Sequence, residues 1–341
     1  MKIGLFTEFS YPGKSEQQTY AEVLEQIALA DALGYDFFSI TESYGKDLFS
    51  CSPFPLGLYV GAAQQASRIR FLTGIISMPI HHPAMLASQV AAADLLTNGR
   101  IMVGIGRGHP WVINRLGVNP TESAARFEEG IRMLVEIFKG EYIENLDGEF
   151  WQLRDFKLSP MPVQRPHPPI YITANRDPES FNLVGSRGHH LMTLPWIATN
   201  EEQGPRVKMY QDALRAADHS VADKDVFTMY PVYVGETDEQ AKAEVVEHWH
   251  RWRGFALEAT GTLPGTPAFA TRSPHLSYDA MVRDSRGVFG CPESCVRILR
   301  RIIDTVGTTH IGLTFHFGGL SQDKVLKSME RCAKFVLPGL R

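Results

Sequence analysis

Cysteine is scarce in this sequence of 341 residues, and its four cysteines form no CxxC pair. A chain of this length needs no disulfide to hold its core, so we expect reduced thiols and a cytoplasmic location. Positive charge is not in excess either, because 34 Lys and Arg residues stand against 38 Asp and Glu residues. Without a basic run, neither nucleic acid nor an anionic membrane is the expected partner. No apolar stretch reaches the roughly 18 residues of a membrane span.

Several signatures of catalytic and metal sites are also missing. The histidine pairs His81-His82 and His189-His190 lack the i, i+4 spacing of a zinc site, and there is no HExxH motif. No GxSxG elbow for a serine nucleophile occurs. The glycines around Arg107 form an incomplete dinucleotide fingerprint, which Pro110 interrupts. We therefore expect no metal, no serine hydrolase chemistry and no nicotinamide dinucleotide site.

What the sequence does contain is a regular alternation of apolar runs and amphipathic stretches. The apolar runs show no polar alternation, which is typical of parallel strands that are covered on both faces. Eight of them alternate with predicted helices, and no break in composition divides the chain. The pattern predicts one (β/α)₈ barrel over residues 1–341. The predicted strands are Lys2–Glu8, Asp36–Thr41, Ile69–Met78, Arg100–Ile105, Pro169–Thr173, Leu191–Leu194, Tyr230–Gly235 and His310–Phe315.

Two stretches depart from the alternation and are predicted as insertions. Residues 141–158 hold Leu146-Asp147-Gly148-Glu149 between two β-prone runs, which indicates a hairpin. Residues 258–290 are rich in Gly, Pro and Ser and are predicted to be a long loop. We expect residues 260–285 of this loop to close over the site as a lid.

In such a barrel the carboxyl ends of the strands carry the functional loops. Arg107 follows one predicted strand directly, and its guanidinium suits a phosphate or a carboxylate, although a solvated arginine in a glycine turn is the alternative. Asp177-Pro178 predicts a helix start whose amides face an anion, with an ordinary capped helix as the alternative. Glu42 is the one acid that the predicted strands place at this mouth.

Five segments, in this order, resemble the bacterial luciferase-like flavin-dependent monooxygenases over nearly the full chain. They are GYDFFSITES, RIRFLTGIISMPIHHPAMLASQVAAADLLTNGRIMVGIGRG, RFEEGIRMLVEIF, PPIYITANRDPES and THIGLTFHFGGLSQDKVLKSMERCAKFVLP. The resemblance implies a barrel that binds reduced FMN at the strand ends, and a homodimer. It further implies that a separate reductase supplies the flavin, which reacts with O₂ to a C4a-(hydro)peroxyflavin and oxygenates a small organic substrate.

The resemblance also assigns residues to the cofactor. Arg107 matches the arginine that clamps the FMN phosphate, and Ser180 with its helix start matches the second phosphate contact. The family's non-prolyl cis peptide beneath the flavin ring falls at Gly74-Ile75. The cofactor-binding residues implied in this way are Glu42, Gly74, Ile75, Arg107, Asn175, Glu179 and Ser180.

One departure from the family bears on the chemistry. The second strand often ends in Glu-His-His, whereas this chain has Glu42-Ser43-Tyr44, so the histidine that serves as base in luciferase is missing. Tyr44, His82 and His109 are the candidate replacements, and a hydroxyl donor such as Tyr44 favours electrophilic oxygenation over aldehyde oxidation. Two other functions stay open at this point: hydride transfer with coenzyme F420 on the same barrel, and flavin binding without turnover.

Overall fold

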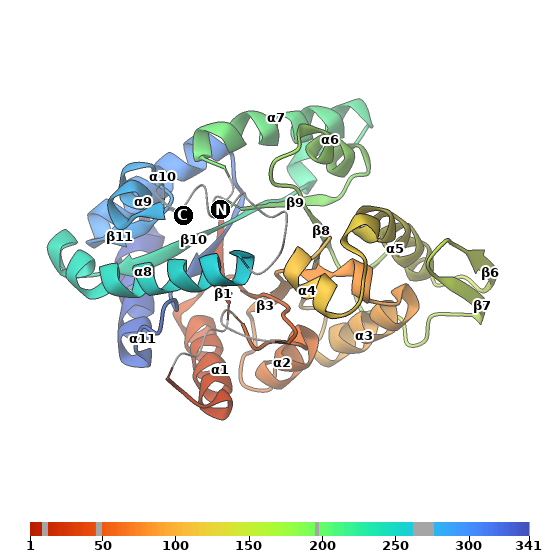
Figure 1. Ribbon diagram of the computed structural model, residues 1–341, viewed down its shortest axis with the longest axis horizontal. Helices are drawn as coiled ribbons and strands as arrows, with labels where there is room; N and C mark the ends of the chain where they lie inside the picture. Colours follow the sequence, from red (N-terminus) through yellow and green to blue (C-terminus); the bar gives the residue numbers. More distant parts are fainter. Residues whose placement is uncertain (9–12, 46–49, 195–197, 262–275, 341) are drawn as a thin grey trace.

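The computed structural model describes residues 1–8, 13–45, 50–194, 198–261 and 276–340. Eight parallel strands form a closed barrel, in which each strand is hydrogen-bonded to the next and the last one to the first. Helices surround this barrel (Figure 1), so the predicted (β/α)₈ architecture is confirmed. In order around the barrel the strands are β1 (Lys2–Thr7), β2 (Phe37–Ile40), β3 (Arg70–Thr73), β5 (Ile101–Gly106), β8 (Ile170–Thr173), β9 (His190–Thr193), β10 (Val226–Val234) and β12 (His310–Thr314).

Aromatic rings fill the inside of the barrel where neighbouring strands carry glycine. The ring of Phe227 lies 6.5 Å from that of Phe6 and 5.7 Å from that of Phe37, between centroids. A Cβ on Gly4 would lie 2.5 Å from the Phe37 ring, and one on Gly312 would lie 2.9 Å from the Phe227 ring. The rings therefore occupy the space that side chains at these two glycines would need.

The outer helices begin and end where local sequence signals predict. Ser15 caps the first helix by accepting a hydrogen bond from the Gln18 amide, and Gly34 ends it at a φ of 86°. Thr199 and Glu202 form a reciprocal capping box at α7. The outer helices are α1 (Glu16–Leu33), α2 (Pro55–Ala62), α3 (Pro83–Leu96), α5 (Ser123–Phe138), α6 (Pro178–Ser186), α7 (Asn200–Ala216), α8 (Asp238–Gly261), α10 (Pro292–Val306) and α11 (Gln322–Arg331).

Several elements differ from the sequence expectation, and three of the differences lie near the strand ends. The predicted strand at 69–78 is interrupted at Gly74-Ile75, continues as β4 (Ile76–Ser77) and then forms a 3-10 turn at Met78–Ile80. β10 begins at Val226, four residues before the predicted start, because its first residues pair with β9 and β12. The short helix α4 (Pro110–Arg115) was not expected, since six residues carry no visible period.

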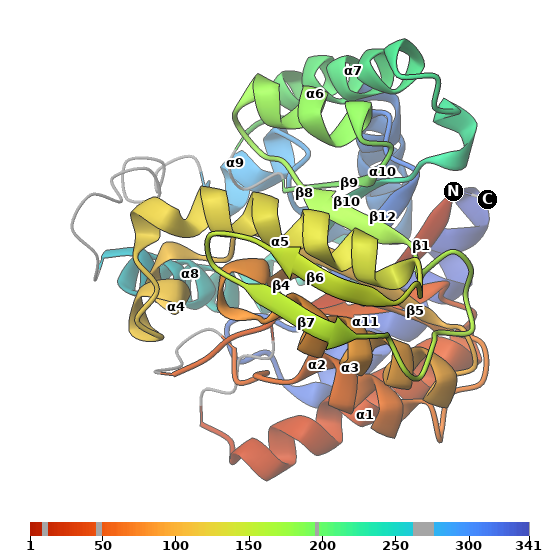
Figure 2. The ribbon, with the colours of Figure 1, turned by 90° about the vertical axis from the view of Figure 1, so that its right-hand side faces the viewer.

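The predicted hairpin is present as β6 (Ile143–Asp147) and β7 (Gln152–Phe156). It packs beside α5 at the side of the barrel (Figure 2). The carboxylate of Glu129 on α5 accepts hydrogen bonds from the backbone amides of Glu149, Phe150 and Trp151. The guanidinium of Arg126 lies 4.4 Å from the centre of the Phe150 ring. The hairpin is therefore fixed by charge-assisted bonds to one helix.

The predicted loop at 258–290 is wrong for the part that the structure describes. α8 continues to Gly261, α9 covers Tyr278–Arg283, and β11 (Val288–Gly290) pairs in parallel with the last three residues of β10. β11 forms because β10 extends beyond the barrel and offers it an open edge. The predicted lid at 260–285 falls largely on residues 262–275, which lie outside the described residues.

The amino-terminal end of the barrel holds a polar cluster. Asp225 accepts a hydrogen bond from the Tyr171 hydroxyl at 2.5 Å, and its carboxylate lies 3.2 Å from His190 and 3.4 Å from His310. Burial opposes the charge, but the bond from His190 and the nearby His310 lower the pKa of Asp225 to about 2. These residues start or flank strands, and in this fold that end serves stability. Of the helices described, none is long and apolar enough to cross a bilayer.

Candidate active site

Arg107 stands at the carboxyl end of β5, directly after Gly106, and its side chain is exposed. β5 pairs with β8 in a register that places Gly104 opposite Tyr171 and Ile105 opposite Ile172. Continued by two residues, this register brings Arg107 beside the residues that lead into α6. No acid in the described part of the chain forms an ion pair with Arg107. An unpaired, exposed guanidinium at the mouth is available to an anion.

The start of α6 has the geometry predicted for it. Asp177 caps the helix by accepting from the Glu179 amide at 3.1 Å, and Pro178 occupies the first turn. The Ser180 hydroxyl donates to Asp177 over 3.4 Å, and Glu179 is exposed. The side-chain oxygen of Asn175 accepts from the Leu194 amide at 2.9 Å, which ties the ends of β8 and β9 together. The helix start and Arg107 are thus on adjacent strand ends.

The peptide bond between Gly74 and Ile75 is cis, as predicted. The Gly74 amide donates to the Ile40 carbonyl at 2.8 Å, and the Gly74 carbonyl accepts from the Thr41 hydroxyl at 3.2 Å. The side chain of Ile75 packs against Gly106, where an added Cβ would lie 3.1 Å from it. The strand ends of β2, β3 and β5 therefore meet at this peptide.

Glu42 is buried and holds three donors together. One carboxylate oxygen, Oε2, accepts from the Ser77 amide at 2.8 Å. The other, Oε1, accepts from the Tyr44 hydroxyl at 3.0 Å and lies 2.8 Å from Nε2 of His81. Burial and the carboxylate of Glu42 raise the pKa of Tyr44 well above its ordinary value, so the hydroxyl keeps its proton.

The other two predicted proton donors are placed differently. His82 caps α3, because its Nδ1 accepts from the Ala84 amide at 3.2 Å. His109 is exposed at the start of α4. Of the two adjacent histidines, His81 and not His82 contacts Glu42. The sequence reasoning missed His81, and no sequence signal distinguished the two rings.

A family model described as "Luciferase-like monooxygenase" matches residues 1–309. The chain belongs to this family. It is therefore an oxidoreductase of the luciferase-like kind.

Individual relatives agree with this membership. The oxygenase component of the flavin-dependent trigonelline monooxygenase of Acinetobacter baylyi is 27% identical over 72% of this chain and 69% of its own length. The crystal structure of monooxygenase RslO1 from Streptomyces bottropensis superposes with a TM-score of 0.89, at 26% identity and 100% coverage of both chains. The oxygenating constituent of 3,6-diketocamphane monooxygenase from Pseudomonas putida, solved with FMN, has the same fold, with a TM-score of 0.81 at 21% identity over 99% of this chain and 98% of that one.

A second acid lies at the mouth of this luciferase-like barrel, contrary to the expectation that Glu42 is the only one. Glu8 follows β1 directly and is 8% exposed. Its Oε2 accepts a hydrogen bond of 2.5 Å from the indole of Trp252 on α8. Burial raises the pKa of Glu8 to about 8, and the bond from Trp252 opposes this only in part. Its signal in the sequence was its place as the last residue of a predicted strand.

His316 follows β12, and its ring is buried beside the same end of the barrel. Neither ring nitrogen has a hydrogen-bond partner among the described residues. Burial lowers the pKa of His316 to about 4, with a further contribution from Lys14. The ring is therefore neutral at physiological pH. No three His, Cys, Asp or Glu side chains gather as metal ligands within the described ranges.

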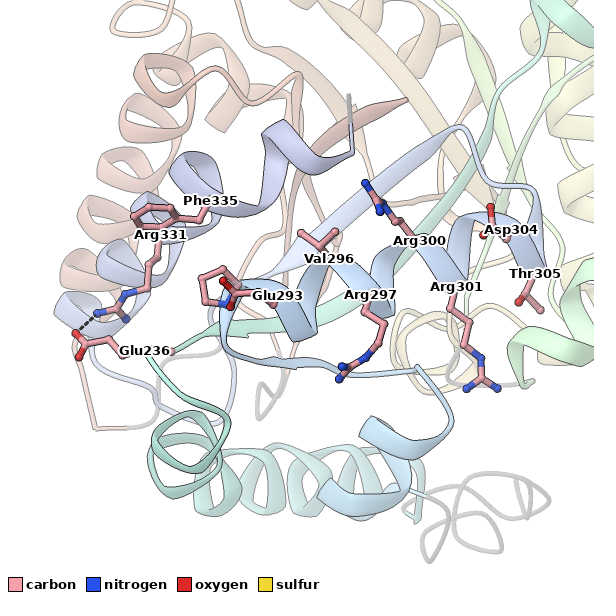
Figure 3. A pocket seen from close by; sticks show the side chains of 12 residues that line it. Glu236, Glu293, Val296, Arg297, Arg300, Arg301, Asp304, Thr305, Arg331 and Phe335 are labelled. Carbon is pink, nitrogen blue, oxygen red and sulfur yellow. Dashed lines mark hydrogen bonds and ion pairs between the residues drawn. The ribbon is translucent and has the colours of Figure 1, made fainter.

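An open groove of about 950 Å³ lies away from the mouth, along α10 (Figure 3). Four arginines line it together with Glu236, Glu293 and Asp304. Arg331 is paired with Glu236 at 2.7 Å, and Arg300 donates to the Gly339 carbonyl at 3.0 Å. Because the basic groups are already paired and lie on the outer helices, we assign no part of the active site to this groove.

Proposed function

We propose that the protein is a two-component monooxygenase that uses reduced FMN and O₂ to oxygenate a small organic substrate. A separate flavin reductase supplies the reduced FMN, and the single domain of residues 1–341 works in the cytoplasm. The observation that carries the proposal is the exposed guanidinium of Arg107, which has no ion-pair partner among the described residues, beside the capped start of α6 in a barrel of this family. Together they offer a cation and backbone amides to one phosphate.

The residues at the mouth offer the charge and the hydrogen-bonding groups that FMN needs. Arg107 and the Ser180 hydroxyl would hold the phosphate, while Asn175 and Glu179 flank it. The Gly74-Ile75 peptide, with Ile75 packed on Gly106, would lie beneath the flavin ring. Reduced flavin supplies the electrons that activate O₂. The chain's part is to orient the ring, to exclude water and to hold protons near it.

The proton-holding groups favour an electrophilic reaction. Ser43 replaces the family's histidine, so no imidazole on the β2 end acts as a base. Tyr44, which keeps its proton, is the leading donor at this position, with His82 and His109 as the other candidates. When the oxygen that the flavin activates carries a proton, it attacks electron-rich carbon, nitrogen or sulfur more readily than it attacks an aldehyde.

The proposal is tested by mixing the protein with photoreduced FMN and then with air, without a reductase. We expect tight binding of reduced FMN, followed by a transient near-ultraviolet absorbance that differs from those of reduced and oxidised FMN. Tight binding of reduced F420 but not of FMN, with hydride transfer to a carbonyl substrate, would support the F420 alternative. Binding of FMN with immediate reoxidation at the rate of free flavin would support a non-catalytic role.

We also propose that the chain forms a homodimer through α2 and α3. These neighbouring helices expose four large apolar side chains: Phe54 (55%), Met85 (63%), Leu95 (44%) and Leu96 (60%). Such a group on adjacent helices is typical of a protein interface. Sedimentation velocity should show a dimer for the parent and a monomer for Met85→Lys combined with Leu96→Lys. The control is Leu116→Lys, an exposed apolar position next to α4, which should remain dimeric.

A further inference from the structure

The buried carboxylate of Glu42 joins two side chains that come from different strand ends. Its Oε1 receives the Tyr44 hydroxyl, which lies two residues further along the chain, at 3.0 Å. The same oxygen lies 2.8 Å from Nε2 of His81, which follows the 3-10 turn at Met78–Ile80. The Glu42 side chain is 2% exposed, whereas that of His81 is 19% exposed. The three groups thus form a continuous hydrogen-bonded path, and His81, at one end of it, is partly exposed to solvent.

We propose that His81, Glu42 and Tyr44 form a proton relay from solvent to the flavin site. This inference rests on the proposed function. Its new element is His81, an imidazole on the neighbouring strand end that delivers protons and does not act as the base that Ser43 replaces. Tyr44 is the inner end of the relay, Glu42 is the bridge, and His81 is the residue that exchanges protons with water. His81 is therefore a positioning and proton-supplying residue that does not touch the flavin.

The transfer balances for protons. The Tyr44 hydroxyl turns from Glu42 and gives its proton to a basic atom of the bound ligand, which leaves a phenolate. The Glu42 carboxylate takes a proton from Nε2 of the His81 ring while Nδ1 takes one from water, and Glu42 passes the Nε2 proton to the phenolate oxygen. The ring then carries its proton on Nδ1, and it returns to its first form by exchanging that proton with water for one on Nε2. Because Oε1 is shared by both donors, each transfer runs over one hydrogen bond.

The surroundings of His81 leave Glu42 as its charged partner. His82, the next residue, turns its ring to the Ala84 amide. From the β2 end, Glu42 bonds the His81 ring directly, and Tyr44 bonds the same Glu42 oxygen. No further hydrogen bond or ion pair involves the ring in the part of the chain that the structure describes. The Nε2 signal of His81 should therefore respond to changes at Glu42 and Tyr44.

The first test uses the protein without flavin and follows the ¹⁵N chemical shift of His81 Nε2 by NMR at one fixed pH. In Glu42→Gln the signal should move, because the partner of Nε2 changes from a carboxylate to an amide. In Tyr44→Phe it should move as well, since Oε1 then loses its second donor. A signal that moves in neither variant would show that the three groups are not coupled, and would overturn the relay.

The second test measures oxygen consumption by bound reduced FMN in the absence of substrate. The reaction FMNH⁻ + O₂ + H⁺ → FMN + H₂O₂ takes up one proton, so it reports proton supply whatever the natural substrate is. General acids contribute about 10²- to 10⁴-fold. We therefore expect His81→Ala and His81→Gln each to slow the reaction tenfold or more, with a dissociation constant for FMN within twofold of the parent.

Glutamine makes the test specific, because its amide can donate to Glu42 but cannot titrate. A parental rate in His81→Gln would show that His81 only positions Glu42, which overturns the relay. Tyr44→Phe combined with His81→Gln should be no slower than the slower single variant, since the groups act in series. The matched control is His219→Gln, a half-buried histidine between α7 and β10 at the opposite end of the barrel, which should keep the parental rate.

The two proposals fail in different ways. A parent protein that does not bind reduced FMN overturns the proposed function and, with it, the role of the relay. A parent that binds and oxidises FMN while His81→Gln behaves like the parent overturns the relay alone.

Discussion

Replacing Arg107 with alanine is expected to weaken the binding of FMN by about 1.5 to 3 kcal/mol, roughly ten- to 150-fold, as for the loss of one charge-assisted contact. The reason is that the Arg107 guanidinium has no ion-pair partner in the described chain, so its whole charge is available to the phosphate. Anaerobic titration calorimetry with reduced FMN measures the change. Riboflavin, which has no phosphate, should bind parent and variant equally.

The comparison of FMN with riboflavin separates the clamp from a general loss of structure. If both ligands weaken to the same extent, Arg107 supports the fold of the mouth and does not contact the phosphate. An unchanged FMN affinity would remove Arg107 from the site altogether. Arg132→Ala, an exposed arginine on α5, is the control for the loss of one positive charge and should leave both affinities unchanged.

Glu8→Gln should change how stability depends on pH. The pKa of the Glu8 carboxyl is about 8 in the folded protein, against an ordinary 4.5. Folding therefore takes up a proton between pH 4.5 and 8, and stability falls as the pH rises through that window. The shift corresponds to roughly 5 kcal/mol at its upper bound. Glutamine keeps an oxygen for Trp252 and carries no charge, so we expect the variant to exceed the parent in stability above pH 8 and to match it near pH 5.

Urea unfolding at pH 5, 7 and 8.5 measures this difference. Other titrating groups cancel when the variant is compared with the parent at each pH. Glu239→Gln removes an exposed carboxylate from the same helix that carries Trp252, and should leave the pH profile as it is in the parent. If the stability difference between Glu8→Gln and the parent is constant across the three pH values, Glu8 is ionised in the folded state.

The barrel could be predicted because its signals are local and repeated. Each barrel strand is a short apolar run, and a helix start such as Asp177-Pro178 is indicated by two adjacent residues. The cis peptide at Gly74-Ile75 was predicted from the resemblance of the surrounding segment to the family, and not from the conformational preferences of the two residues. β11 could not be predicted, because three residues in a Gly- and Ser-rich stretch become a strand only when β10 extends beside them.

The proton-bearing groups of the mouth were harder to predict, because their surroundings depend on how other parts of the chain fold. Which ring of His81-His82 meets Glu42 is decided by the 3-10 turn before them, and turns of three residues leave no period in a sequence. Glu8 is buried by Trp252, a residue 244 positions away, so its environment exists only after folding. The exposed place of Arg107 at a strand end could be predicted, because it follows from the strand alone and needs no distant partner.

The pairing of β11 with β10 also determines how far α8 and β11 can move relative to the barrel. α8 bonds to the end of β1 through Trp252 and to the chain after β12 through Arg251, whose guanidinium donates to the Gly318 carbonyl at 3.1 Å. β11 continues the same strand ladder that forms the barrel wall. α8 and β11 therefore belong to one cooperative unit with the wall, and a hinge motion that lifts them would have to break sheet hydrogen bonds. In hydrogen exchange, the amides of Val232 to Val234 should be as protected as those inside the barrel.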